Sequence, residues 1–146
     1  MSLMPDVNIL VYAHKPAAPA HAAYQAWLMS QLDGQETLAL SMLVAVGFVR
    51  VVTNGRIQAN PTPMAVALAA IEELARHPRC RVVGPGPHHL DDVARLCRAS
   101  GVTGPDVSDA QHAALAIAEG ATLVTRDAGF RRFEPHGLRW QHLVLE

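Results

Sequence analysis

Near its start the chain reads Met4-Pro5-Asp6-Val7-Asn8-Ile9-Leu10-Val11-Tyr12-Ala13. Asp6 stands just before an apolar run, where either Asp6 or Asn8 can cap the start of a helix. A second acid, Asp127, directly follows the mostly apolar segment 121–126, which is typical of a short buried strand. Acids that stand beside buried segments are poorly explained by a need for solubility alone. The stretch therefore predicts an α/β core with a functional site at the end of its strands.

Short apolar runs alternate with helical patterns along the rest of the chain. We expect strands at 4–6, 37–40, 81–83, 121–124 and within 138–145, and helices at 9–13, 21–32, 42–52, 64–76, 88–99 and 106–119. Ser41 and Thr62 are the expected caps of two of these helices. This alternation favours an α/β fold in which helices flank a central parallel sheet on both faces, as three layers.

Length and composition fit one domain that spans residues 1–146. The chain has 146 residues, of which 50% are hydrophobic, enough for a sizeable core. Met1 to Leu3 precede a second methionine, so we interpret them as a cloning remnant and Met4 as the natural start. With no signal sequence and no run long enough to cross a bilayer, we expect a cytoplasmic protein without a membrane partner.

Charge and cysteine content restrict the function classes further. The formal net charge is −1, so a general electrostatic attraction to nucleic acid is not expected, and any RNA contact needs local arginines. The two cysteines, Cys80 and Cys97, form no CxxC pair and no zinc-binding spacing. Two reduced thiols are the simpler interpretation.

The aspartates at element ends predict a metal site. Asp109 opens the alanine-rich stretch 110–118, and the carboxyl ends of parallel strands share one crevice. We therefore expect Asp6, Asp109 and Asp127 to converge there. Converging carboxylates repel one another unless a cation lies between them, and Mg²⁺ or Mn²⁺ prefers such hard oxygen ligands. A bound ion of this kind activates water and stabilises charge on a phosphodiester, which predicts a metal-dependent nuclease.

Each acid also has a local structural explanation. Asp106, three residues before Asp109, can be a helix N-cap, although it is also a candidate additional metal ligand. Asp127 can bind the backbone of its own turn, and Asp6 can be a helix cap. The same structural position recurs in three separate segments, and this recurrence favours the site over three unrelated caps.

Other polar residues are candidates for supporting roles. Asn8 and Thr125 lie within two residues of Asp6 and Asp127 and could orient the carboxylates. Arg50 and Arg126 are candidates for holding substrate phosphate. His112 could approach the crevice, but its pattern favours a surface position.

Four blocks of the chain, taken together, resemble the PIN-domain ribonucleases, and most closely the VapC-type toxins of bacterial toxin–antitoxin pairs. The blocks are residues 5–13, 47–54, 109–116 and 122–130, in the order of the family. The resemblance implies a PIN fold, Mg²⁺- or Mn²⁺-dependent cleavage of RNA, a homodimer and a cognate antitoxin. It also implies that Asp6, Asp109 and Asp127 are the metal-binding acids.

One position departs from this family. Gly47 stands where the family usually has a glutamate, and no acid occurs between Glu36 and Glu72. This departure motivates a second hypothesis, a weakened or inactive PIN-like module that binds RNA or antitoxin without cutting. A third hypothesis, a phosphatase with Asp6 as nucleophile, rests on the position of Asp6 after a strand. The phosphatase is disfavoured because Asn8 stands where its second acid is expected.

Overall fold

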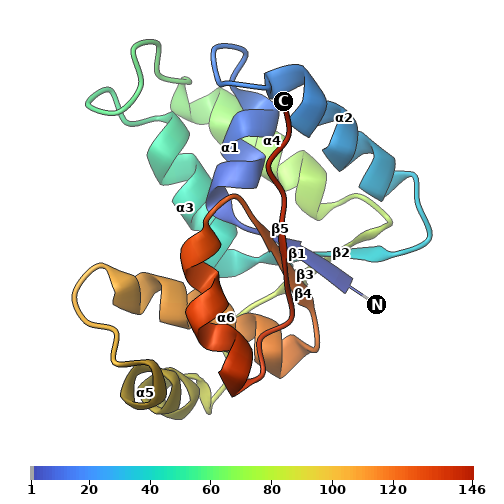
Figure 1. Ribbon diagram of the computed structural model, residues 1–146. Coiled ribbons are helices and arrows are strands. Elements are labelled where there is room, and N and C mark those ends of the chain that lie inside the picture. The colour runs from blue at the N-terminus through green and yellow to red at the C-terminus, as the bar shows by residue number, and fades with distance from the viewer. Residues whose placement is uncertain (1) are drawn as a thin grey trace.

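A five-stranded parallel sheet forms the centre of the computed structural model, which describes residues 2–146. Its strands, in sheet order, are β3 (Cys80–Val83), β2 (Thr37–Ser41), β1 (Ser2–Pro5), β4 (Thr122–Thr125) and β5 (Trp140–His142). The helices are α1 (Val7–His14), α2 (His21–Leu32), α3 (Met42–Val52), α4 (Met64–Ala75), α5 (His89–Ser100), α6 (Asp106–Glu119) and the 3-10 helix η1 (Ala128–His136). Every neighbouring strand pair is parallel, as predicted (Figure 1).

Alternating side chains on the strands build a separate core on each face of the sheet. On one face, Met4 of β1 and Leu123 of β4 pack with α5, α6 and η1. On the other, Val124 of β4 packs with α1 and α2, and Leu40 of β2 packs with α1, α3 and α4. Neighbouring residues of a strand point to opposite faces, so these short strands supply both cores. This arrangement confirms the predicted three layers.

Two strand-to-helix junctions have side-chain caps. Asp6 is the N-cap of α1, and its carboxylate accepts a hydrogen bond from the backbone N–H of Val7. Ser41 caps α3 as predicted, accepting from the N–H of Val44 at 3.3 Å. Each cap satisfies a helix N–H that has no partner within the helix. The chain therefore turns into α1 immediately after β1 and into α3 immediately after β2.

The expected cap at Thr62 is wrong. Pro63 holds the N-cap position of α4, without a side-chain cap. Thr62 is buried one residue earlier, where its hydroxyl lies 3.2 Å from His14 Nε2 and 3.4 Å from Lys15 Nζ. These contacts tie the loop before α4 to the end of α1.

The first described residues belong to the sheet, and both cysteines are unpaired. Ser2 and Leu3 belong to β1, and Leu3 is in register with Leu38 and Thr122. Met1 lies outside the described residues, and Met4 as the natural start stays a prediction. Cys80 and Cys97 are free. No helix within residues 2–146 is long and apolar enough to cross a membrane.

Candidate metal centre

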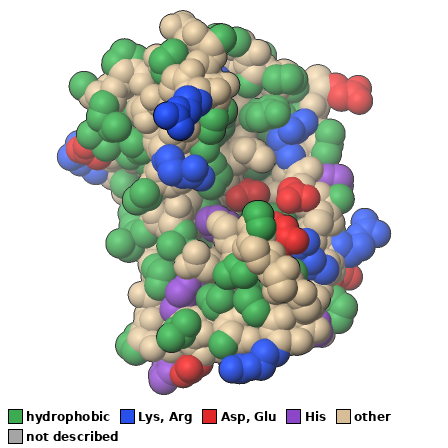
Figure 2. Space-filling model, turned by 90° about the vertical axis from the view of Figure 1, so that its left-hand side faces the viewer, with side chains coloured by type: hydrophobic (Ala, Val, Ile, Leu, Met, Phe, Trp, Pro, Cys, Tyr) green, Lys and Arg blue, Asp and Glu red, His purple; other side chains and the backbone are tan. Residues whose placement is uncertain are grey.

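A cavity of about 390 Å³ opens beside the ends of β1 and β4. Its wall includes three aspartates: Asp6 at the start of α1, Asp109 in the first turns of α6, and Asp127 at the start of η1. The remaining lining residues are Val7, Asn8, Leu43, Val46, Gly47, Arg50, Val51, Ser108, Gln111 and His112. Acidic side chains gather near the middle of the face shown in Figure 2. The fold thus brings the three predicted acids to one cavity.

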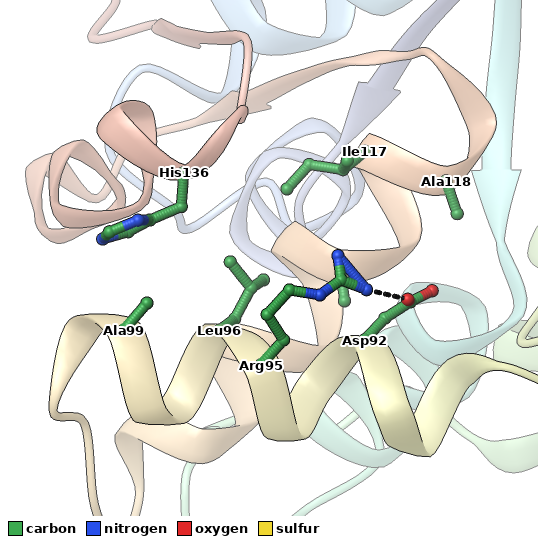
Figure 3. A pocket seen from close by; sticks show the side chains of 8 residues that line it. Asp92, Arg95, Leu96, Ala99, Ile117, Ala118 and His136 are labelled. Carbon is green, nitrogen blue, oxygen red and sulfur yellow. Dashed lines mark hydrogen bonds and ion pairs between the residues drawn. The ribbon is translucent and has the colours of Figure 1, made fainter.

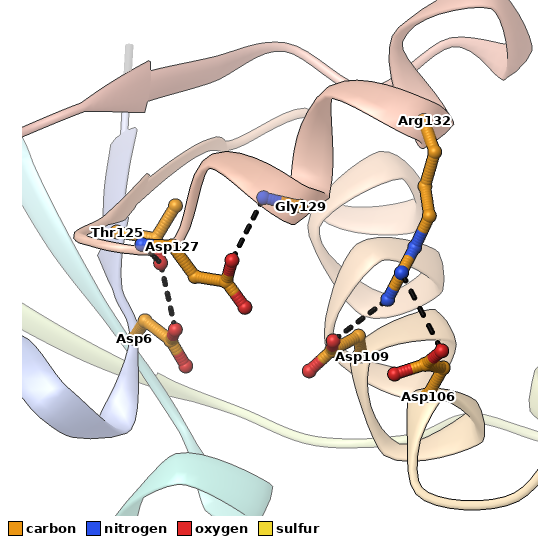
Figure 4. Close-up of polar contacts among 7 residues, drawn as sticks. All are labelled: Asp6, Asp106, Asp109, Thr125, Asp127, Gly129 and Arg132. Atoms are coloured by element: carbon orange, nitrogen blue, oxygen red, sulfur yellow. Dashed lines mark hydrogen bonds and ion pairs between the residues drawn. The ribbon is translucent and has the colours of Figure 1, made fainter.

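Asp6 is held firmly. The residue is only 7% exposed, its Oδ1 accepts from the N–H of Val7 at 2.8 Å, and its Oδ2 accepts from the hydroxyl of Thr125 at 2.8 Å. The Thr125 oxygen in turn accepts from the N–H of Asp127 at 3.0 Å. Thr125 therefore orients Asp6 and the chain at Asp127 together, the position predicted for a supporting residue (Figure 4).

Asp127 lies at the turn into η1. Its Oδ1 accepts from the N–H of Gly129 at 2.7 Å, so the local explanation, an acid that binds its own turn, is confirmed. The turn contact does not remove Asp127 from the cavity. Figure 4 shows its carboxylate on the same side as that of Asp6, across from Asp109.

Arg132 of η1 bridges the two aspartates of α6. Its Nη2 donates to Asp109 Oδ2 at 2.8 Å, and its Nη1 lies 3.6 Å from Asp106 Oδ2. The expected N-cap role of Asp106 is wrong because Pro105 is the N-cap and already has helical angles, φ −59° and ψ −26°. Asp106 is therefore the first helical residue, and its side chain is 53% exposed. It is not among the residues that line the cavity.

The surroundings of Asp109 raise the pKa of its carboxyl group. Burial raises its pKa to about 6, and the charge of Asp127 raises it too. Arg132 opposes this increase, while Asp6 and Asp106 add smaller upward contributions. A carboxylate with a raised pKa among like charges lacks a sufficient counter-ion. A divalent cation would supply that missing charge.

The donor chemistry fits Mg²⁺ or Mn²⁺, which take carboxylate oxygens and retain several waters. The side-chain positions are not yet those of an assembled site. Among residues 2–146, no group of three or more His, Cys, Asp or Glu side chains is arranged to hold an ion. Asp109 is directed partly toward Arg132 (Figure 4). An ion shared with Asp6 and Asp127 would compete with Arg132 for the Asp109 carboxylate.

The predicted supporting residues divide into two groups. Asn8 and Arg50 line the cavity. Arg126 does not: its guanidinium stacks over Tyr12, 4.2 Å from the ring centroid, and its Nε donates to Tyr24 Oη at 2.8 Å. Arg126 therefore joins α1, α2 and the end of β4.

Gly47 lies in the cavity wall. An added Cβ would lie 3.0 Å from Cγ2 of Val7, the residue after Asp6. The absence of a side chain thus allows α3 to approach α1 closely beside the acids. A longer residue at this position requires Val7 to shift by a few tenths of an ångström.

The surface position expected for His112 is wrong. His112 lines the cavity, and burial lowers its pKa while the charge of Asp6 raises it. In the described part of the chain its Nδ1 is buried and makes no hydrogen bond. The signal in the sequence was its spacing, since residues three apart on a helix share a face and His112 follows Asp109 by three.

Another cavity, of about 420 Å³, lies between α5 and α6 (Figure 3). Its wall combines Leu96, Ile117 and several alanines with His136 and the Asp92–Arg95 ion pair. The one acid that lines it is already paired. The aspartate cavity is therefore the candidate site.

Comparisons with known proteins agree with this geometry. The model of the PIN domain family matches residues 3–134, and the chain belongs to this family. Ribonuclease VapC43 of Mycobacterium tuberculosis is 38% identical over 94% of this chain and 92% of its own length. Ribonuclease VapC33 of the same organism is 32% identical over 99% of both chains.

Solved structures share the fold. VapBC2 from Rickettsia felis, bound to a DNA fragment from their promoter, superimposes with a TM-score of 0.70 at 22% identity, covering 97% of this chain and 98% of that one. Mycobacterium tuberculosis VapC20, a sarcin-ricin loop cleaving toxin, has a TM-score of 0.68 at 15% identity, with coverage of 97% and 98%. These likenesses confirm the predicted PIN fold.

Proposed function

We propose that this protein is a metal-dependent endoribonuclease and the toxin of a VapC-type toxin–antitoxin pair. The supporting observation is the convergence of Asp6, Asp109 and Asp127 on one cavity of a PIN domain. Relatives that match nearly the whole chain are named ribonucleases. The PIN fold alone would not define the chemistry, but the acids supply the ligand type that phosphodiester hydrolysis by Mg²⁺ requires.

The residues have separate tasks in this proposal. Asp6, fixed by Val7 and Thr125, is the preorganised ligand, and Asp127 and Asp109 complete the negative wall. A bound Mg²⁺ or Mn²⁺ ion supplies Lewis acidity and makes hydroxide available near neutral pH. Arg50, exposed on the rim of the cavity, donates to phosphate oxygens of the RNA.

The binding-module hypothesis remains the second candidate because Gly47 leaves the cavity without the family's usual glutamate. Under this hypothesis the cavity would bind RNA or antitoxin without cutting. Calorimetry separates the two, because the enzyme must bind Mn²⁺ at millimolar concentration or below. A wild-type chain that binds RNA but no Mn²⁺ would favour the module.

The partners form a further part of the proposal. We propose a cognate antitoxin, a homodimeric toxin and a cytoplasmic location. Similar structures include VapBC complexes. An antitoxin segment bearing an arginine near the acids would replace metal charge, and the Arg132–Asp109 contact supports the idea that a guanidinium fits there. Co-purification of the chain with the product of a neighbouring small reading frame tests this partnership.

RNA cleavage with and without Mg²⁺ tests the activity. Asp109→Asn and Asp6→Asn should abolish metal-dependent cleavage while the circular dichroism spectrum stays unchanged. Asp33→Asn is the matched control because Asp33 is an exposed acid at the end of α2, away from the cavity. Cleavage by Asp6→Asn at the wild-type rate would refute the assignment.

A further inference from the structure

Arg132 pairs with a cavity carboxylate that a metal ion would also need. Of the three cavity aspartates, Asp109 alone pairs with an arginine in the described part of the chain, through Arg132 Nη2 at 2.8 Å. The same guanidinium already reaches Asp106, 3.6 Å from Nη1. The two acids lie within the first turns of α6, while the arginine comes from η1 (Figure 4).

The Arg132 contact is incomplete. Within residues 2–146, Nε of Arg132 is buried without a hydrogen-bond partner, so one of its donors is unsatisfied. A buried donor without a partner costs free energy. Its side chain is still 31% exposed and that of Asp106 is 53% exposed, so the guanidinium has room to move toward Asp106. The observed position is therefore not the only favourable one.

An arriving cation competes with the arginine for Asp109. A divalent ion held by Asp6 and Asp127 would attract the Asp109 carboxylate and repel the guanidinium that pairs with it. Asp106, which lies outside the cavity wall, offers Arg132 an alternative partner. A carboxylate pair that shares one arginine can thus exchange it without leaving a charge unpaired.

We propose that Arg132 is a built-in counter-ion of the metal-free site: it pairs with Asp109 until a divalent ion binds, and then transfers to Asp106. Arg132 is in this sense a positioning residue that sets metal affinity, and Asp106 is its acceptor rather than a metal ligand. The inference rests on the proposed metal site.

Calorimetric titration of the full chain with Mn²⁺ tests the exchange. Arg132→Gln should bind Mn²⁺ about three- to tenfold more tightly than wild type, because the ion no longer displaces a charge-assisted bond. Arg131→Gln is the matched control: it removes the same charge from the neighbouring residue, an exposed arginine that lies over Trp140. Its affinity should stay within twofold of wild type.

A double-mutant cycle tests the acceptor role of Asp106. Asp106→Asn should weaken Mn²⁺ binding in the wild-type background and have little effect in the Arg132→Gln background. Equal weakening in both backgrounds would make Asp106 an independent ligand and overturn its acceptor role.

The outcomes separate this inference from the proposed function. If wild type binds Mn²⁺ and Arg132→Gln binds it no more tightly, the counter-ion role is wrong while the metal site stands. If neither protein binds Mn²⁺, both proposals fail. If Arg132→Gln binds Mn²⁺ and wild type does not, Arg132 blocks the ion without releasing Asp109, and the transfer to Asp106 is wrong.

Discussion

Thr125 donates its hydroxyl hydrogen to Asp6 Oδ2 at 2.8 Å, although 119 positions separate the two residues in sequence. The contact joins the end of β4 to the end of β1 beneath the cavity. Thr125 is fully buried, and its oxygen also accepts from the N–H of Asp127. One hydroxyl thus links two of the three acidic positions.

Replacing Thr125 with valine should weaken metal binding and lower the stability of the fold. The change leaves Asp6 Oδ2 and the N–H of Asp127 without their partner, which costs about 1–3 kcal/mol for each group left unsatisfied. We expect a lower urea midpoint and weaker Mn²⁺ binding. Thr125→Ser keeps the hydroxyl and loses a buried methyl, so it should lose stability while retaining Mn²⁺ affinity. Equal Mn²⁺ affinity in Thr125→Val and wild type would show that the hydroxyl does not organise the site.

The raised pKa of Asp109 predicts how stability depends on pH. Its folded-state pKa of about 6 exceeds the ordinary 3.8, so protonated Asp109 stabilises the metal-free fold fully at low pH. This contribution is lost as the pH rises through about 6. Because the side chain is partly exposed, we expect a change on the order of 1 kcal/mol between acidic and neutral pH.

Asp109→Asn lacks this titration. The unfolding free energy of the wild type minus that of the variant should therefore decrease as the pH is raised from 4.5 to 7.5. Urea unfolding with chelator present measures this difference. A difference independent of pH would contradict the raised pKa. Mn²⁺ affinity of the wild type should weaken as the pH falls through about 6, because the ion needs the ionised carboxylate.

The two arginines first considered for phosphate should now behave differently. Arg50→Gln should raise KM for RNA with little effect on stability, since Arg50 is exposed on the cavity rim. Arg126→Gln should lower stability by about 1 kcal/mol or more, because it removes the Tyr12 stacking contact and the bond to Tyr24. Thermal unfolding and cleavage kinetics, measured on both variants, distinguish the two roles. If Arg126→Gln instead raises KM and leaves stability unchanged, Arg126 contacts the substrate.

Restoring an acid at Gly47 should strengthen the site. Gly47→Glu adds a carboxylate at the cavity wall, and we expect tighter Mn²⁺ binding and faster cleavage than in Gly47→Gln. Glutamine is the matched control because both side chains meet Val7 at the same short distance and only one adds charge. If the two variants bind Mn²⁺ equally, the missing glutamate is not what limits this site.

Local chemistry made much of the fold predictable. The start of α3 at residue 42 followed from Ser41 as its cap, and the strand ends placed three acids together. The cap at Asp106 failed because Pro105 already adopts helical angles, a choice that residue preferences do not determine. The positions of Arg126 and Arg132 depend on partners distant in sequence, Tyr24 and Asp109, so no local pattern indicated them.

The cavity is lined by helices from both faces of the sheet. Asp6 begins a helix of one core, and Asp109 belongs to a helix of the other. A cation shared by both carboxylates would cross-link the two helical layers and, at concentrations above its Kd, would raise the unfolding free energy of the whole domain. Hydrogen exchange should then slow in both α1 and α6 when the ion is added. Removal of the ion by a chelator should restore the faster exchange in both helices.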